Sequence, residues 1–183
     1  MKAMVMPEPY WTIYVDGSCM GNQDVDALTP AGWGIVVVEG DTGLGRGNGE
    51  PIHEASGRVI CDPDNPNWLG AEVGSNNTAE LTAFAMGLRW LLMQEKDFSA
   101  TIRTDSTYAG NLADGSWRAK ANKELVSRVQ SLWQEVSSLR SISWNHIRAH
   151  RGHRWNERAD HLASRAAAEE NPLPMEFWKP GQR

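Results

Sequence analysis

Short runs rich in β-branched and aromatic side chains recur along the chain, and they predict five β-strands. The first run ends in Asp16-Gly17-Ser18, a typical turn sequence. The second run, which begins at Trp33, is almost continuously apolar, as expected of a strand buried on both faces. Strands are predicted over residues 11–15, 33–39, about 54–60, 100–104 and 141–147.

Between and after these strands, apolar residues recur at the spacing of an amphipathic helix. The clearest case is residues 78–95, where Leu81, Phe84, Leu88 and Leu92 share one face and Asn77 or Thr78 is the expected cap. Helices are predicted over residues 78–95, about 107–113, 124–139 and 156–169.

The order of these elements is β-β-β-α-β-α-α-β-α. Three consecutive strands followed by alternating helices and strands predict an α/β protein with a mixed sheet flanked by helices. The length of 183 residues suits one domain. We therefore expect a single domain over residues 1–183, with a core at about 10–170 and a C-terminal tail at 171–183.

Composition narrows the class of protein. Hydrophobic residues make up 40% of the chain and charged residues 22%, which is typical of a globular protein. No apolar run approaches the roughly 20 residues that a membrane span requires, and residues 1–10 do not resemble a secretory signal. Two cysteines, Cys19 and Cys61, fit a reducing compartment. We expect a cytoplasmic protein with no membrane partner. Its net charge of −5 argues at first sight against a nucleic-acid partner.

Acidic residues stand at positions where α/β proteins place their ligands. Asp16 and Asp105 each follow a predicted strand directly, and they lie side by side if the two strands are parallel neighbours. Glu80 and Asp160 stand near the beginnings of two predicted helices, where negative charge is tolerated. Each acid alone is also explained as an ordinary turn or helix-start residue.

Four carboxylates that converge on one spot repel one another unless a cation neutralises them. Ligands that are all oxygen select Mg²⁺ or Mn²⁺ rather than Zn²⁺. An alternative zinc site could use His146, His150 and His153 with the cysteines, but nothing in the chain resembles a CxxC motif.

Four motifs in this order resemble the type 1 ribonucleases H, over a stretch from about residue 10 to residue 168. The matching stretches are Tyr14-Val15-Asp16-Gly17-Ser18-Cys19 with Gly21-Asn22, Asn76-Asn77-Thr78-Ala79-Glu80-Leu81, Thr104-Asp105-Ser106-Thr107-Tyr108, and His150-Arg151-Gly152-His153 with Asn156-Glu157-Arg158-Ala159-Asp160. One such motif is common, whereas four in order are specific. The resemblance implies the five-stranded ribonuclease H fold.

The resemblance also implies an endonuclease that hydrolyses the RNA strand of RNA–DNA hybrids with two Mg²⁺ ions, for which Mn²⁺ is a possible substitute. The products would carry 5′-phosphate and 3′-hydroxyl ends. Asp16 would bridge both ions, Asp160 would complete the site that activates water, and Glu80 and Asp105 would complete the site at the leaving oxygen. His150 matches the family's mobile histidine, which assists proton transfer or product release.

Other matching positions imply contacts with the hybrid, through phosphates and the 2′-hydroxyls of the RNA. The expected contact residues are Gly17, Ser18, Cys19, Asn22, Ser75, Asn76, Asn77, Ser106 and Thr107. Trp117 stands beside Arg118, Lys120 and Lys123, and it would pack either against the DNA strand or against neighbouring side chains. Without the resemblance, Asn76 and Asn77 read as a helix cap.

The chain departs from the family pattern in one respect that concerns affinity. Only residues 118–123 occupy the interval where many members carry a basic protrusion, so we expect weaker binding and a possible tethering partner. Separately, we expect a monomer. Charge is nevertheless uneven: residues 140–165 hold six arginines against two acids, a net charge of +4, and the rest carries −9. We expect metal- and salt-dependent binding. Alternatives are a nuclease domain of a reverse-transcriptase-type polyprotein and a non-catalytic nucleic-acid-binding module.

Overall fold

The computed structural model describes residues 10–182, and it contains the predicted elements in the predicted order. No helix in this range is both long enough and apolar enough to cross a membrane. The elements are β1 (Tyr10–Cys19), β2 (Ala31–Glu39), β3 (Glu50–Arg58), α1 (Asn76–Leu92), β4 (Ser99–Thr104), α2 (Thr107–Ala113), α3 (Lys123–Leu139), β5 (Ile142–His146) and α4 (Arg154–Ala167).

The five strands form one mixed sheet in the order β3-β2-β1-β4-β5. The first three strands pair antiparallel, whereas β1 with β4 and β4 with β5 pair parallel. The first and fourth strands are parallel neighbours, which is the condition under which Asp16 and Asp105 lie side by side, and β1 lies at the centre of the sheet.

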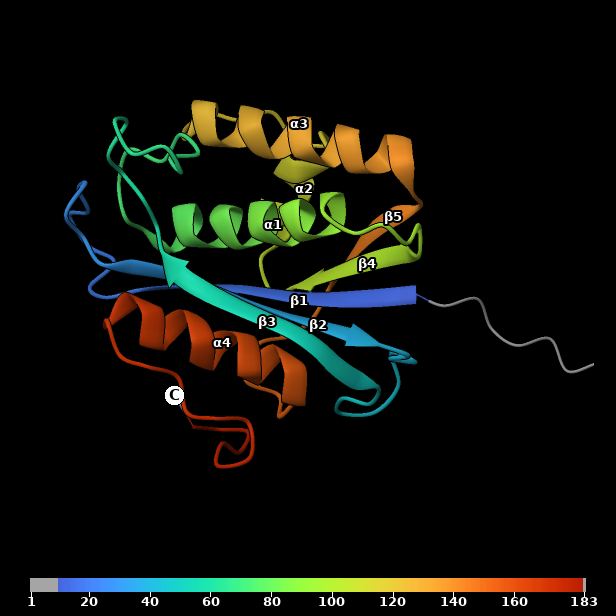
Figure 1. Cartoon of the computed structure of the whole chain (residues 1–183). Coiled ribbons are helices and arrows are strands. Elements are labelled where there is room, and N and C mark those ends of the chain that lie inside the picture. The colour runs from blue at the N-terminus through green and yellow to red at the C-terminus, as the bar shows by residue number, and fades with distance from the viewer. Residues whose placement is uncertain (1–9, 183) are drawn as a thin grey trace, which may run out of the picture.

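Helices cover both faces of the sheet: α4 lies on one face, and α1, α2 and α3 lie on the other (Figure 1). Side chains of β1 alternate between the faces, so that Ile13 and Val15 join the core beneath α1 while Tyr14 joins the core beneath α4. Gly34 lets α4 approach closely, because a Cβ atom there would lie only 2.5 Å from the carbonyl oxygen of Ala159.

Several boundaries differ from the predictions: β3 covers Glu50–Arg58 rather than about 54–60, α1 ends at Leu92 rather than 95, and α4 covers Arg154–Ala167 rather than 156–169. Two further differences, at the start of α1 and at the end of β1, have identifiable physical reasons. Helix α1 begins at Asn76, and its cap is Ser75 rather than Asn77 or Thr78. The Ser75 hydroxyl accepts the Thr78 N–H at 3.0 Å, and the Thr78 hydroxyl accepts the Ser75 N–H at 2.9 Å, which is a reciprocal capping box. Strand β1 continues to Cys19 instead of ending before Asp16, because its antiparallel pairing with β2 continues that far.

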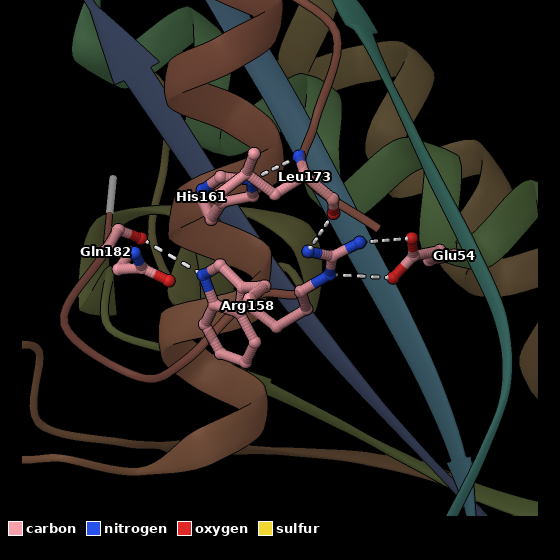
Figure 2. Close-up of polar contacts among 6 residues, drawn as sticks. Glu54, Arg158, His161, Leu173 and Gln182 are labelled. Carbon is pink, nitrogen blue, oxygen red and sulfur yellow. Dashed lines mark hydrogen bonds and ion pairs between the residues drawn. The ribbon is translucent and has the colours of Figure 1, made fainter. Parts of the chain in front are cut away.

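The C-terminal tail packs onto α4 through a buried arginine (Figure 2). The Arg158 side chain is almost fully buried, and it donates to both carboxylate oxygens of Glu54 on β3, at 2.9 and 2.6 Å. It also donates to the carbonyl oxygen of Leu173 at 2.7 Å, while the Leu173 N–H donates to Nε2 of His161 at 3.0 Å. The tail thus completes the outer surface of α4 and buries Trp178 there.

We expect Glu54→Gln to lower the free energy of unfolding by about 1–3 kcal/mol, because it removes the charged partner of a buried guanidinium. Urea denaturation at pH 7 would measure this loss. The matched control is Glu50→Gln, an exposed position on the same strand, where we expect no comparable change. Equal denaturation midpoints for Glu54→Gln and the wild type would contradict the stabilising role of this ion pair.

Candidate active site

The strand register places Asp16 beside Asp105. The last parallel pair between β1 and β4 is Val15 with Thr104, so the next residue of each strand is an aspartate at the point where the two strands separate. Both side chains alternate onto the face covered by α4. Asp16 is buried, with 3% of its surface exposed, and Asp105 is half-buried.

Glu80 joins these two acids from the first turns of α1. The backbone of α1 touches β1 at Gly17, where a Cβ atom would lie 2.4 Å from the Glu80 nitrogen. Any larger residue at this position would push the helix and its carboxylate away from the strand. Carboxylate oxygens of Asp16, Glu80 and Asp105 lie within 4.8 Å of one another.

Asp160 and His150 complete the rim of the same site. Asp160, from α4, lies outside the group of three but interacts electrostatically with both Asp16 and Asp105, and His150 interacts with Asp105. A single cleft of about 480 Å³ brings together all five predicted catalytic residues.

The cluster is unfavourable while it is ionised and without a cation. Burial, followed by the charges of Asp105 and Asp160, raises the pKa of Asp16 well above its usual value. Burial and the charges of Asp16 and Asp105 likewise raise the pKa of Glu80, and burial raises the pKa of Asp105. Negative charge is thus concentrated here at a cost in solvation.

The donor set fits a hard divalent cation. All of the closest ligand atoms are carboxylate oxygens, the type that Mg²⁺ and Mn²⁺ prefer. Oε2 of Glu80 is buried and has no hydrogen-bond partner among residues 10–182, so a bound cation would satisfy it. The histidine-based zinc alternative receives no support, because His153 is buried and caps α4 instead.

Most of the predicted substrate contacts line the cleft beside the acids, whereas Trp117 does not. These lining residues are Gly17, Ser18, Cys19, Asn76, Asn77 and Ser106. Asn22 is linked to the cleft because its Oδ1 accepts the Asn76 N–H at 3.0 Å. Ser75 caps α1, and Thr107 is exposed at the start of α2.

Trp117 lies in a separate cavity of about 660 Å³ between α2 and α3. Arg118, Lys123 and Trp133 also line this cavity. Trp117 is 49% exposed, so a large part of its ring is accessible to a ligand.

One cleft residue was not predicted from the sequence. Ser164 follows Asp160 by one helical turn, and its hydroxyl donates to the Ser18 hydroxyl at 3.3 Å. The i, i+4 relation to Asp160 was the signal that could have identified it.

Comparisons with known proteins agree with this fold and site. The RNase H family model matches residues 8–168. The ribonuclease H of Anaplasma marginale is 35% identical over 162 residues, which is 82% of this chain and 86% of the relative.

Two solved structures resemble the chain in fold. RNase H1 from the halophilic archaeon Halobacterium salinarum is 22% identical, with a TM-score of 0.62 over 87% of this chain and 98% of that one. LC11-RNase H1, solved in complex with an RNA/DNA hybrid, is 24% identical, with a TM-score of 0.62 over 87% and 97%. The family match, the relative of 35% identity and the shared fold together mean that this chain belongs to the RNase H family.

Proposed function

We propose that this protein is an endoribonuclease that hydrolyses the RNA strand of RNA–DNA hybrids, leaving 5′-phosphate and 3′-hydroxyl ends. The observation that carries the proposal is the group of Asp16, Glu80 and Asp105, with carboxylate oxygens within 4.8 Å of one another, in a cleft of an RNase H family member. LC11-RNase H1, which has the same fold, was solved with such a hybrid bound.

Asp16, Glu80, Asp105 and Asp160 would hold two Mg²⁺ ions, or Mn²⁺ as a substitute. Bound divalent ions supply positive charge at the attacking and leaving oxygens of an in-line phosphodiester hydrolysis. The protein contributes the carboxylates, which β1, β4, α1 and α4 hold in one cleft. Asp16 and Asp105 each interact with the other three acids, and Asp16 is the more deeply buried of the two, which supports its role as the shared ligand.

His150 would move a proton or assist product release at the edge of the cleft. Its side chain is exposed to solvent and also interacts with Asp105, so it could exchange protons between solvent and the acids. An imidazole suits this role because its usual pKa lies near neutral pH.

Hybrid recognition would use short polar side chains beside the acids and an aromatic group farther away. Asn76 and Asn77 are exposed at the start of α1, where amides can donate to phosphate or ribose oxygens. The backbone near Cys19, with Glu80, would contact a 2′-hydroxyl of the RNA. Trp117, with Arg118 and Lys123, would contact the DNA strand from its separate cavity.

The cellular setting is also part of the proposal. Cys19 and Cys61 are both free, which suits a reducing compartment such as the cytoplasm. We propose a monomer, and a separate partner could tether it to hybrids because the basic segment at residues 118–123 is short.

We expect the wild-type protein with Mg²⁺ to cleave the labelled RNA strand of a hybrid, but neither duplex RNA nor single strands. Asp16→Asn should lower kcat by at least about 10³-fold, because charge stabilisation at the reacting oxygens is lost. Gel analysis of the products would give the rate and the end chemistry. The matched control is Asp64→Asn, at an exposed acid in the loop before α1. Undiminished cleavage by Asp16→Asn would refute the proposed site.

We expect Asp16→Asn to raise the melting temperature of the metal-free protein by a few degrees at pH 7–8. The folded protein has raised carboxyl pKa values, so the stability that these groups contribute is complete below the usual pKa of about 4 and is lost as the pH rises through the folded values. The difference between variant and wild type should therefore shrink as the pH falls toward 4.

With Mg²⁺ present, the wild type should instead melt at a higher temperature than Asp16→Asn, because Mg²⁺ binds the folded wild type more tightly than the variant. Thermal melts with and without MgCl₂ would test both parts of the prediction. A wild-type melting temperature that does not respond to Mg²⁺ would count against a cation site at these acids.

We expect Trp117→Ala to raise KM for the hybrid about tenfold with little change in kcat, because stacking against one nucleotide contributes roughly 1–3 kcal/mol. Steady-state kinetics would separate the two constants. Phe177→Ala is the matched control, since Phe177 is an exposed aromatic of the C-terminal tail. If Trp117 only packs locally, its variant would lose stability and keep its KM.

A further inference from the structure

A buried polar network lies beneath the start of α4, with the Tyr14 hydroxyl at its centre. This hydroxyl donates to Oδ2 of Asp41, and it accepts from Nη1 of Arg103 at 2.9 Å. Nε2 of His153 lies 3.4 Å from the same hydroxyl. Tyr14, Asp41 and His153 are all buried, so each of their polar groups needs a partner within the protein.

The helix cap fixes the tautomer of His153, and with that tautomer the 3.4 Å contact between Nη1 of Arg103 and Nε2 of His153 joins two donors and is not a hydrogen bond. Nδ1 accepts the N–H of Asn156 at 3.4 Å, which leaves the proton on Nε2, where it can be donated to Tyr14. Burial and the charge of Arg103 lower the pKa of His153, which keeps the ring in this neutral form. Tyr14 then accepts from Arg103 and His153 and donates to Asp41.

The network is adjacent to the acidic cluster on the same two strands. Tyr14 and Arg103 are paired across β1 and β4, and each precedes a catalytic aspartate, Asp16 or Asp105, by two residues. Side chains two residues apart on a strand point to the same face, about 6.6 Å apart. The network therefore occupies the next position along the face that holds the acids.

His153 also ends the loop that carries His150. This loop begins at Ile147, whose N–H donates to the carbonyl oxygen of Thr104 at 2.8 Å, and it ends at His153, the cap of α4. Between these two anchors, His150 and Gly152 both have left-handed backbone conformations, with φ values of 57° and 75°. The Gly152 N–H also donates to Oε1 of Glu157 at 3.2 Å. The position of His150 therefore depends on this bond together with the two ends of the loop.

The glycine-rich loop at residues 40–49 contacts the start of α4 next to His153, where the His150 loop ends. Asp41 lies at its beginning, and Tyr10 donates to the Asp41 carbonyl oxygen. Farther along, the carbonyl oxygen of Arg46 accepts the Arg154 N–H at 2.8 Å. The carbonyl oxygen of Asn48 accepts Nε1 of Trp155, also at 2.8 Å.

We propose that Tyr14, Asp41 and His153 are positioning residues that, together with loop 40–49, hold the His150 loop in place beside the acidic cluster. None of the three lines the cleft that holds the acids, and they would act through the loop between Ile147 and His153. The proposal rests on the proposed hybrid-cleaving function, in which His150 takes part.

Two substitutions separate this role from helix capping. Tyr14→Phe removes only the central hydroxyl, and His153→Ser keeps a good helix cap but is too short to reach Tyr14. We expect both variants to lower kcat for hybrid cleavage about tenfold, since small displacements of a catalytic group cost that much or more. KM should stay within about twofold, because the predicted hybrid contacts lie on other segments.

Glu54→Gln is the matched control for lost stability. It weakens the hold on α4 through Arg158, away from the His150 loop. We expect it to lower the melting temperature and to leave kcat unchanged. A kcat that falls in proportion to stability in all three variants would overturn the positioning role, and so would a His153→Ser variant with wild-type kcat.

Amide hydrogen exchange of the metal-free protein gives a readout that does not depend on catalysis. Exchange at residues 148–152 should become faster in Tyr14→Phe and His153→Ser but not in Glu54→Gln, while residues 76–80 stay unchanged in all of them. Unchanged exchange at residues 148–152 would overturn the proposal. Wild-type protein that fails to cleave hybrids would refute the proposed function alone, and the exchange result would still decide the positioning role.

Discussion

The parallel pairing of β1 with β4 is the constraint on which the rest of the site depends. It ends at Val15 with Thr104, so that Asp16 and Asp105 emerge together where the strands separate. A shift of one residue would move one aspartate to the opposite face of the sheet, toward α1. The register that buries Ile13 and Val15 beneath α1 therefore also fixes the acids on the face of α4.

This arrangement places like charges together in a buried cleft, which opposes folding, and close packing on both sides of the sheet holds it. Helix α1 touches β1 at Gly17, and α4 touches β2 at Gly34, so neither helix can move away without losing a tight contact. The pair of Arg158 with Glu54 adds a further attachment of α4 to β3. The stability gained from this packing thus offsets the repulsion among the carboxylates, which a bound cation would relieve.

Local sequence patterns were sufficient to predict some features that depend on neighbouring residues, such as the bounds of α2 and the acids near strand ends. The helix at residues 107–113 has the predicted bounds, because Ser106 caps it and Asp114 ends it. The strand-end acids were identifiable because strands and turns have strong local signatures. Long-range contacts were the part that remained hidden. The extension of β1 depends on β2, and the Tyr14 network joins groups 27 and 139 residues apart, which no periodicity reveals.

The charge distribution shows why a count of arginines overstates the attraction for a hybrid. Among the six arginines of residues 140–165, Arg158 is buried against Glu54 and Arg165 pairs with Glu170 at 3.2 Å. Arg140 donates to two backbone carbonyl oxygens, of Leu91 and Phe98. Arg148 and Arg151, in the His150 loop, are exposed near the cleft. Because no lysine or arginine is among the described residues that line the cleft, attraction for phosphate there must come largely from bound divalent ions, so that substrate affinity and metal binding are physically coupled.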